Sequence, residues 1–281
     1  MLIPIRDDNP TSRRAYVTLA IIVANVAIFV LWQKPWSPPI DQQFFAFCHA
    51  EIPWEVTHRT NLAEGGAEAR VAIDEQLDVN GRAFQLLLQG KADQVSGLPP
   101  ELQDFAGCPD KSWWGAVFVA MFLHGGWLHI GGNMLFLWVF GNNVEDKIGR
   151  IPYLLFYLFC GVAATFGQLL VDPSSVIPNL GASGAIAGVL GAYLVMFPRR
   201  RVYSLVPIIF VFTLMPLPAV VVLGFWFILQ FFSGVTTFAD NVNGGVAYFA
   251  HVGGFVAGVA LALLFFPKER FKQEPEQGLF P

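Results

Sequence analysis

Six long apolar segments constrain the fold of this chain more than any other feature of its sequence. Each contains a window of about 18 apolar residues, near the length that an α-helix needs to cross the hydrocarbon core of a bilayer. The composition agrees, because 54% of the 281 residues are hydrophobic and only 14% are charged, which is rare among water-soluble domains. The sequence therefore predicts an all-α polytopic membrane protein with six membrane-spanning helices. We expect them at Tyr16–Trp32, Trp114–Phe140, Tyr153–Val171, Leu180–Phe197, Leu217–Ser233 and Ala247–Phe266.

The basic residues between these segments predict the orientation of the protein, because Lys and Arg concentrate on the cytoplasmic side of membrane proteins. Connections after the third and fifth segments contain neither residue type. The expected cytoplasmic residues lie before the first segment and after the second, fourth and sixth: Arg6, Arg13, Arg14, Lys147, Arg150, Arg199, Arg200, Arg201, Lys268, Arg270 and Lys272. We therefore expect cytoplasmic tails at 1–15 and 267–281, with helices two, four and six running inward from the outer side.

The connection after the first segment, Gln33–Trp113, is long and polar and carries twelve Asp and Glu residues. We call it the acidic segment, and we expect it to form an insertion outside the cytoplasm, between helices one and two. Its alanine-rich stretch, Asn61–Leu88, favours one or two amphipathic helices. Cys48 and Cys108 lie near its two ends. A disulfide between them is allowed outside the cytoplasm and would close a long loop, although two free thiols remain the alternative.

Ser183 lies between two small residues at the start of the fourth apolar segment, in the sequence Gly-Ala-Ser-Gly. A proline and an asparagine precede this sequence, as they often precede a helix. The hydroxyl would then lie near unpaired backbone N–H groups and the positive end of the helix dipole, which suits a nucleophile whose product is an oxyanion. In the alternative interpretation, Gly181, Gly184 and Gly188 form a helix-packing face, and Ser183 is one more small residue on it.

Other polar side chains are predicted at a similar depth, near the outer ends of the second and sixth helices. His124, His129 and Asn133 belong to the second segment, and His251 begins the sixth. His129 and Asn133 are four residues apart and therefore share one helix face. Because polar groups are costly in lipid, they usually face the protein interior or a water-filled cavity. Hydrogen bonds that merely join neighbouring helices are the alternative interpretation.

Glycine spacing links these polar residues. Gly184 and Gly188 in the fourth segment, like Gly254 and Gly258 in the sixth, have the Gly-x-x-x-Gly spacing that permits close helix approach. Close packing of these helices would bring Ser183 and His251 face to face. The combination favours catalysis over simple packing.

The expected chemistry is acyl transfer to Ser183, catalysed by a pair of residues. His251 would accept a proton from Ser183 and later deliver it to a leaving amine. Segments four and six contain no acidic residue that could orient the histidine, so we expect a dyad. The backbone N–H of Ser183 and the side chains of His129 and Asn133 would stabilise the oxyanion.

With these residues in view, the chain resembles the rhomboid intramembrane serine proteases over all six segments. Residues 181–184 match the family's Gly-x-Ser-Gly, His129 and Asn133 match its oxyanion motif, and residues 250–254, Ala-His-Val-Gly-Gly, match its sixth-helix motif. The resemblance gives His124 a structural role. It implies cleavage of transmembrane protein substrates in or near their membrane-spanning segment, without metal, other cofactor or nucleic acid.

Two positions depart from the family pattern. Many rhomboids have Trp-Arg in the first outer loop, whereas residues 113–115 here are Trp-Trp-Gly. Many also have a tyrosine beneath the histidine, four residues after the serine, where this chain has Ala187. Other packing must therefore orient His251. We expect the protein in a bacterial inner membrane, with its active site opening to the outer side; no pattern indicates its oligomeric state.

Two functions from other classes compete with proteolysis. An inactive relative that binds membrane clients would typically lack the serine or the histidine, and this chain has both. A transporter would need charged residues along a complete pathway, and the inner halves of helices two, four and six contain none.

Overall fold

The computed structural model describes residues 2–77, 80–97, 107–108, 111–208, 211–239 and 246–265. Within this part, four helical stretches are long and apolar enough to cross a membrane. They correspond to the expected first, third, fifth and sixth segments. Helix α11 (Ser183–Met196) is apolar but shorter. The four are α1 (Tyr16–Ala27) with its π-helical continuation η1 (Ile28–Gln33), α10 (Arg150–Leu169), α12 (Ala219–Ala239) and α13 (Tyr248–Phe265).

The outward faces of these helices carry large apolar side chains. Leu31, Ile151 and Leu264 are 73%, 75% and 72% exposed, and many other large apolar side chains of these helices are exposed as well. Apolar surface of this extent is unfavourable in water and matches the hydrocarbon of a bilayer. Together with the length of the helices, it identifies an integral membrane protein.

The second expected segment is interrupted. Its residues form α7 (Trp113–Ala120), α8 (Trp127–Phe136), the π-helical η3 (Leu137–Gly141) and α9 (Asn142–Ile148). The expectation of one continuous helix is wrong between α7 and α8, because Gly126 has a φ of 156° that is incompatible with a helix. The Gln33 side chain accepts a hydrogen bond from the backbone N–H of His124 at 2.8 Å and donates one to its carbonyl at 3.0 Å. These bonds satisfy backbone groups that a helix would otherwise pair.

Helices α11 and α13 touch backbone to backbone. A Cβ added at Gly254 would collide with the carbonyl oxygen of Gly184, and one at Gly258 with that of Gly188. Gly191 is equally close to the carbonyl of Phe255. Only glycine permits this approach, which sets the depth of α13 relative to α11 and aligns their outer ends.

The all-α expectation is wrong at the other end of α11. Strands β1 (Ile3–Asp7), β2 (Arg201–Ile208) and β3 (Val211–Pro218) form an antiparallel sheet in the order β1-β2-β3. The sequence of residues 202–218, which is apolar but interrupted by three prolines, predicts an inner-face connection that leads into the fifth segment. Proline is tolerated in an edge strand such as β3, where a missing N–H breaks no ladder. Asp7 links β1 to helices α11 and α9, because it accepts hydrogen bonds from the Tyr193 hydroxyl at 2.5 Å and from the Asn143 amide at 2.8 Å.

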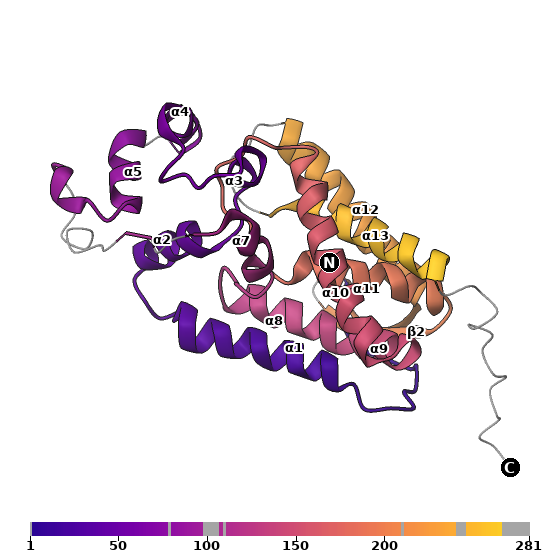
Figure 1. Cartoon of the computed structure of the whole chain (residues 1–281). Coiled ribbons are helices and arrows are strands. Elements are labelled where there is room, and N and C mark those ends of the chain that lie inside the picture. Colours follow the sequence, from indigo (N-terminus) through magenta and orange to yellow (C-terminus); the bar gives the residue numbers. More distant parts are fainter. Residues whose placement is uncertain are drawn as a thin grey trace, which may run out of the picture.

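The acidic segment forms a helical unit beside the membrane helices (Figure 1). Its alanine-rich stretch, Asn61–Leu88, contains the helices α4 and α5, where the sequence predicts one or two amphipathic helices. The unit has its own apolar core, built around Phe47, Trp54, Leu62 and Ile73, and Val176 joins this core from the loop before α11. Its elements are α2 (Pro39–His49), α3 (Pro53–His58), α4 (Gly66–Leu77), α5 (Gly81–Leu88) and the 3-10 helix η2 (Ala92–Gln94). The expected C-terminal tail, 267–281, lies outside the described residues.

Candidate active site

Ser183 and His251 form a hydrogen bond between two different helices. Ser183 is the first residue of α11, and His251 lies in the first turn of α13. The distance from Ser183 Oγ to His251 Nε2 is 2.7 Å. The glycine contacts that follow within two turns on the same helices hold this geometry, since they fix the relative depth of α11 and α13. A hydroxyl and an imidazole at this distance are the arrangement needed to activate a serine nucleophile.

His129 presents a ring nitrogen to the space beside Ser183. Its Nδ1 accepts a hydrogen bond from the backbone N–H of Gly125 at 3.2 Å. A neutral imidazole has one N–H and one acceptor nitrogen, so this bond assigns the proton to Nε2. A methyl carbon added at Gly181 would lie 2.9 Å from that Nε2 and 3.4 Å from Ser183 Oγ. The donor nitrogen and the hydroxyl therefore border the same small space over Gly181.

Asn133 supplies a second unused donor. It is buried one turn further along α8, and its Nδ2 has no hydrogen-bond partner among the described residues. A buried amide donor without a partner costs free energy, so such a group is often reserved for a ligand. His129 and Asn133 line the same cavity as Ser183.

Gly181 shapes the approach to the serine. Its φ of 131° is accessible to glycine and disfavoured for other residues, and its N–H donates to the carbonyl of Ala120 at 2.9 Å. A side chain here would also press on His129. The glycine is therefore required both by backbone conformation and by space.

His124 lies behind His129 rather than in the site. Its side chain is buried, and its ring meets the His129 ring edge-on at 5.1 Å between centroids. The ring of Phe29 in η1 also meets the His124 ring edge-on, at 6.4 Å between centroids. The contacts of His124 are those of a packing residue that supports His129.

The residue that the sequence analysis missed is Gln230, on α12. Its Oε1 lies 2.6 Å from His251 Nδ1, the ring nitrogen that faces away from Ser183. Trp226, one turn earlier on α12, places its ring 6.0 Å from the His251 ring. Gln230 and Trp226 thus contact the His251 ring, whereas the position four residues after the serine is Ala187. Gln230 is an isolated amide within the fifth apolar segment, which was the available signal, because such a group seldom faces lipid.

A cavity of about 760 Å³ joins these groups. It is lined by Ser183, His251, His129, Asn133, Gln230 and Glu51, among a majority of apolar residues. Such a volume and lining suit a binding site for an extended apolar ligand with a few oriented polar groups. No group of three or more His, Cys, Asp or Glu side chains in the described ranges is placed to hold a metal ion.

Glu51 brings the acidic segment to the edge of this cavity. Its carbonyl accepts a hydrogen bond from the N–H of Asn179 at 2.7 Å, and its carboxylate accepts one from the Asn179 amide at 3.0 Å. Burial raises the pKa of Glu51 to about 7, although Asn179 and Lys111 act in the opposite direction. Asn179 stands in the loop that leads into α11. The acidic segment is thereby attached to the chain just before Ser183.

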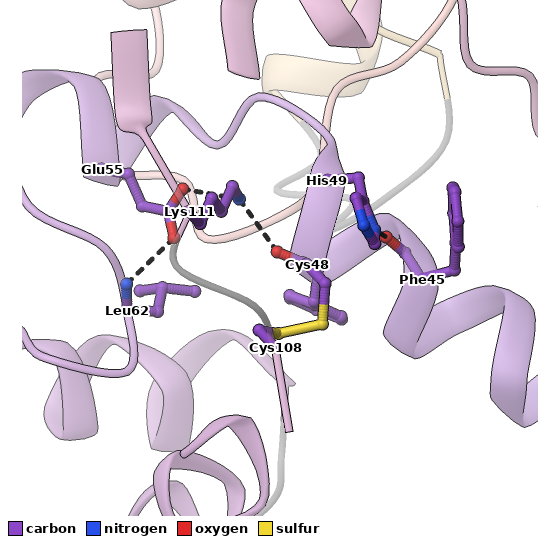
Figure 2. The surroundings of a disulfide bond; sticks show 8 residues. Phe45, Cys48, His49, Glu55, Leu62, Cys108 and Lys111 are labelled. Atoms are coloured by element: carbon purple, nitrogen blue, oxygen red, sulfur yellow. Dashed lines mark hydrogen bonds and ion pairs between the residues drawn. A yellow bond between two sulfur atoms is a disulfide. The ribbon is translucent and has the colours of Figure 1, made fainter. Parts of the chain in front are cut away.

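Three further interactions hold this part of the acidic segment together (Figure 2). Cys48 and Cys108 form a disulfide bond, with Cα atoms 5.0 Å apart. Lys111 pairs with Glu55 at 2.7 Å and donates to the carbonyl of Phe47 at 2.9 Å. Burial lowers the pKa of Lys111 and raises that of Glu55, while their attraction opposes both shifts. This ion pair joins the end of the acidic segment, just before α7, to helix α3.

The fold and this cavity define an integral membrane protein in which a serine and a histidine from different helices are hydrogen-bonded. A family model, the Rhomboid domain, matches residues 110–268, more than half of the chain. The protein therefore belongs to the rhomboid family.

Several curated relatives agree with this assignment. Rhomboid protein 1, mitochondrial, of Saccharomyces cerevisiae is 32% identical over 151 residues, which cover 51% of this chain and 40% of the relative. Rhomboid-like protein 11, chloroplastic, of Arabidopsis thaliana is 40% identical over 75 residues, 27% of this chain and 26% of the relative. Rhomboid protease GluP of Bacillus subtilis is 31% identical over 158 residues, 54% of this chain and 26% of the relative. The matched region spans less than half the length of each of these relatives.

Proposed function

We propose that this protein is an intramembrane serine endopeptidase that cleaves membrane-anchored proteins in or near their transmembrane segment. The observation that carries the proposal is the 2.7 Å hydrogen bond from Ser183 to His251 within an apolar cavity. Family membership and the protease activity named for the Bacillus subtilis relative support the same reaction.

In the proposed mechanism, His251 Nε2 accepts the proton of Ser183 while the serine Oγ attacks the carbonyl carbon of the scissile peptide bond. The carbonyl oxygen becomes an oxyanion, which accepts hydrogen bonds from His129 Nε2, Asn133 Nδ2 and the backbone N–H of Ser183. The tetrahedral intermediate then collapses. The C–N bond breaks, and His251 returns the proton to the leaving amine. The result is an ester of the substrate's amino-terminal part on Ser183 and a released carboxyl-terminal fragment with a new amino terminus.

Hydrolysis of this ester repeats the cycle with water as the nucleophile. His251 accepts a proton from the water as its oxygen attacks the ester carbonyl, and it then protonates Ser183 Oγ as the C–O bond breaks. The polar side chains around the cavity give water a favourable path that the surrounding lipid does not.

The proposed topology has six spans, with the interrupted run from α7 to α9 as the second and α11 as the fourth. Residues 16–266 form the membrane domain, with cytoplasmic tails at 1–15 and 267–281. The acidic segment is an insertion on the outer side, where the active site opens. The basic residues of the inner connections support this orientation, and we place the protein in a bacterial inner membrane.

The substrates that fit this arrangement are membrane proteins whose helix unwinds near the membrane surface. Ser183 and His251 lie at the beginnings of their helices, so a cleaved bond must reach this end of the bundle. An extended peptide is also required, because a helix hides its carbonyl carbons from a nucleophile. A transmembrane segment that contains helix-breaking Gly or Pro near one end satisfies both conditions.

The experiment that tests the proposal is covalent labelling of detergent-solubilised protein by a fluorescent fluorophosphonate. Wild type and Ser233→Ala, which changes a serine on α12, should be labelled, whereas Ser183→Ala and His251→Ala should not. The same set should then be compared for cleavage of a transmembrane reporter in liposomes. Absence of both labelling and cleavage in folded wild-type protein would favour a non-catalytic role in binding membrane clients.

A further inference from the structure

The imidazole of His251 bonds to side chains from two other helices. On one side, Nε2 meets Ser183 Oγ of α11 at 2.7 Å. On the other side, Nδ1 meets Gln230 Oε1 of α12 at 2.6 Å. The amide oxygen of Gln230 thus occupies the place beside the histidine that a carboxylate takes in a serine–histidine–aspartate triad.

The chemistry of these atoms assigns the proton of the neutral ring. An amide oxygen can only accept a hydrogen bond, so Nδ1 must carry the hydrogen. The lone pair then lies on Nε2, where it can accept the proton of Ser183. With the opposite tautomer, Nε2–H would point at the serine and the ring could not act as its base. Gln230 therefore selects the form of His251 that general base catalysis requires.

We propose that Gln230 is a positioning residue that holds His251 in the Nδ1–H tautomer and thereby completes the Ser183–His251 pair. The inference rests on the proposed function and adds a third helix to the site. It also answers how the histidine is oriented with Ala187 in place of a tyrosine. Trp226 and Gln230 lie one turn apart on the same face of α12, so one helix face provides both the ring contact and the hydrogen bond.

The proposal makes the reactivity of the serine depend on the position of α12. Helices α11 and α13 are joined by backbone contacts at their glycines. In contrast, α12 packs on α13 through side chains, such as the stacked pair Phe227 and Phe255 at 4.6 Å. A small outward displacement of α12 would remove the amide from Nδ1 while leaving the serine and histidine in contact. His251 would then lose its preference for the Nδ1–H tautomer before it separates from Ser183.

The test compares three variants with wild type. Gln230→Met keeps the length of the side chain and removes the amide acceptor. Gln230→Glu keeps an acceptor oxygen. Thr236→Val is the matched control, because it removes a polar group from the same helix at an exposed position where the hydroxyl bonds only to its own helix.

The first readout is the tautomer itself. The chain has five histidines, so ¹⁵N-histidine labelling gives a small set of ring signals, and His251→Ala identifies those of His251. We expect protonated Nδ1 and unprotonated Nε2 in wild type, Gln230→Glu and Thr236→Val. We expect a mixture of tautomers in Gln230→Met. A purely structural role for Gln230 would leave the ring signals of the folded variant unchanged.

The second readout is the rate of fluorophosphonate labelling and of reporter cleavage. We expect Gln230→Met to lower kcat roughly 10- to 100-fold with little change in KM. This is less than the roughly 10²- to 10⁴-fold that general acid–base catalysis contributes, because His251 remains and only its tautomer is no longer fixed. Gln230→Glu should recover most of this loss. A folded Gln230→Met protein with the wild-type tautomer and rate overturns the proposal.

If Gln230→Met does not fold, the Gln230→Glu variant decides, because a folded Gln230→Glu protein with the Nε2–H tautomer also overturns the proposal. The readouts separate two failures. Labelling that needs Ser183 and His251 but not Gln230 leaves the protease function intact and refutes only this inference. Wild-type protein that is never labelled refutes the protease function, while the ring signals still test the tautomer.

Discussion

Glu51 holds Asn179 by both backbone and side chain, with hydrogen bonds of 2.7 Å and 3.0 Å. This relationship connects two parts of the chain that the sequence separates by more than a hundred residues. Asn179 belongs to the short loop that positions Gly181 and Ser183, so the acidic segment supports the serine from outside the membrane bundle. The acidic segment therefore helps to hold the loop that carries the candidate nucleophile.

Replacing Glu51 by glutamine should remove the loss of stability that wild type undergoes as the pH rises and the buried Glu51 ionises. Burial raises the folded-state pKa of Glu51 to about 7, above its ordinary value of 4.5. A raised pKa in an acid means that its contribution is favourable below the unfolded pKa and is lost as the pH rises through the folded pKa. We expect Glu51→Gln to unfold like wild type at pH 4.5 and at a temperature several degrees higher at pH 8. Thermal unfolding in detergent measures this, and an equal difference at both pH values contradicts it.

Removing either cysteine of the disulfide should destabilise the acidic segment. The bond closes a loop with a sequence separation of 60, for which a loss of roughly 2–4 kcal/mol is typical. Cys48→Ser and Cys108→Ser should lower the unfolding temperature equally, and the double variant should be no worse than either. Thermal unfolding in detergent measures this loss. Additive effects of the two substitutions would show that the thiols act separately.

Asn133 should contribute to turnover without being essential. Its unpaired Nδ2 is a candidate donor to the oxyanion, and removal of one such donor costs about 10²- to 10³-fold in kcat. Asn133→Ala should therefore retain measurable cleavage, unlike Ser183→Ala. Asn133→Asp keeps the shape but replaces the donor by an acceptor, so it should be slower still. An Asn133→Asp protein as fast as wild type would remove this residue from the oxyanion site.

Gly181→Ala should impair the site through His129. The φ of 131° disfavours alanine, and the new methyl group would lie 2.9 Å from the histidine ring. We expect fluorophosphonate labelling to fall by about tenfold or more as the donor is displaced. Gly224→Ala on α12 is the control, because its added methyl meets nothing within 4 Å. Replacing a helical glycine in open space should stabilise by about 0.5–1 kcal/mol and leave labelling unchanged.

Most of the candidate site could be predicted from the sequence because polar residues are rare in apolar segments. Ser183, His251, His129 and Asn133 stand out for that reason, and glycine spacing indicated which helices meet. Gln230 is equally unusual in an apolar segment, but its role depends on a contact between α12 and α13. Sequence periodicity carries no information on how a third helix is rotated about its axis, so the hydrogen bond to His251 could not be inferred.

The errors in the predicted fold have a similar origin. Apolar composition alone predicted one helix through the second segment, but the backbone turn at Gly126 is supported by Gln33, which is distant in sequence. The sheet was missed because the prolines of β2 and β3 favoured a connection over strands. Its third strand, β1, comes almost two hundred residues earlier in the chain.

The pairing of β1 with β2 has a consequence for biosynthesis. Ile3 pairs with Leu205, so β1 stays unpaired while the segments up to α11 are synthesised. Such a distant contact forms late, after the intervening chain has been ordered. Strand β1 is thus translated before its partner strand but cannot reach its final place until that strand has been made. A substitution in β1 would therefore act on a late stage of assembly, even though β1 is translated before the helices that it joins.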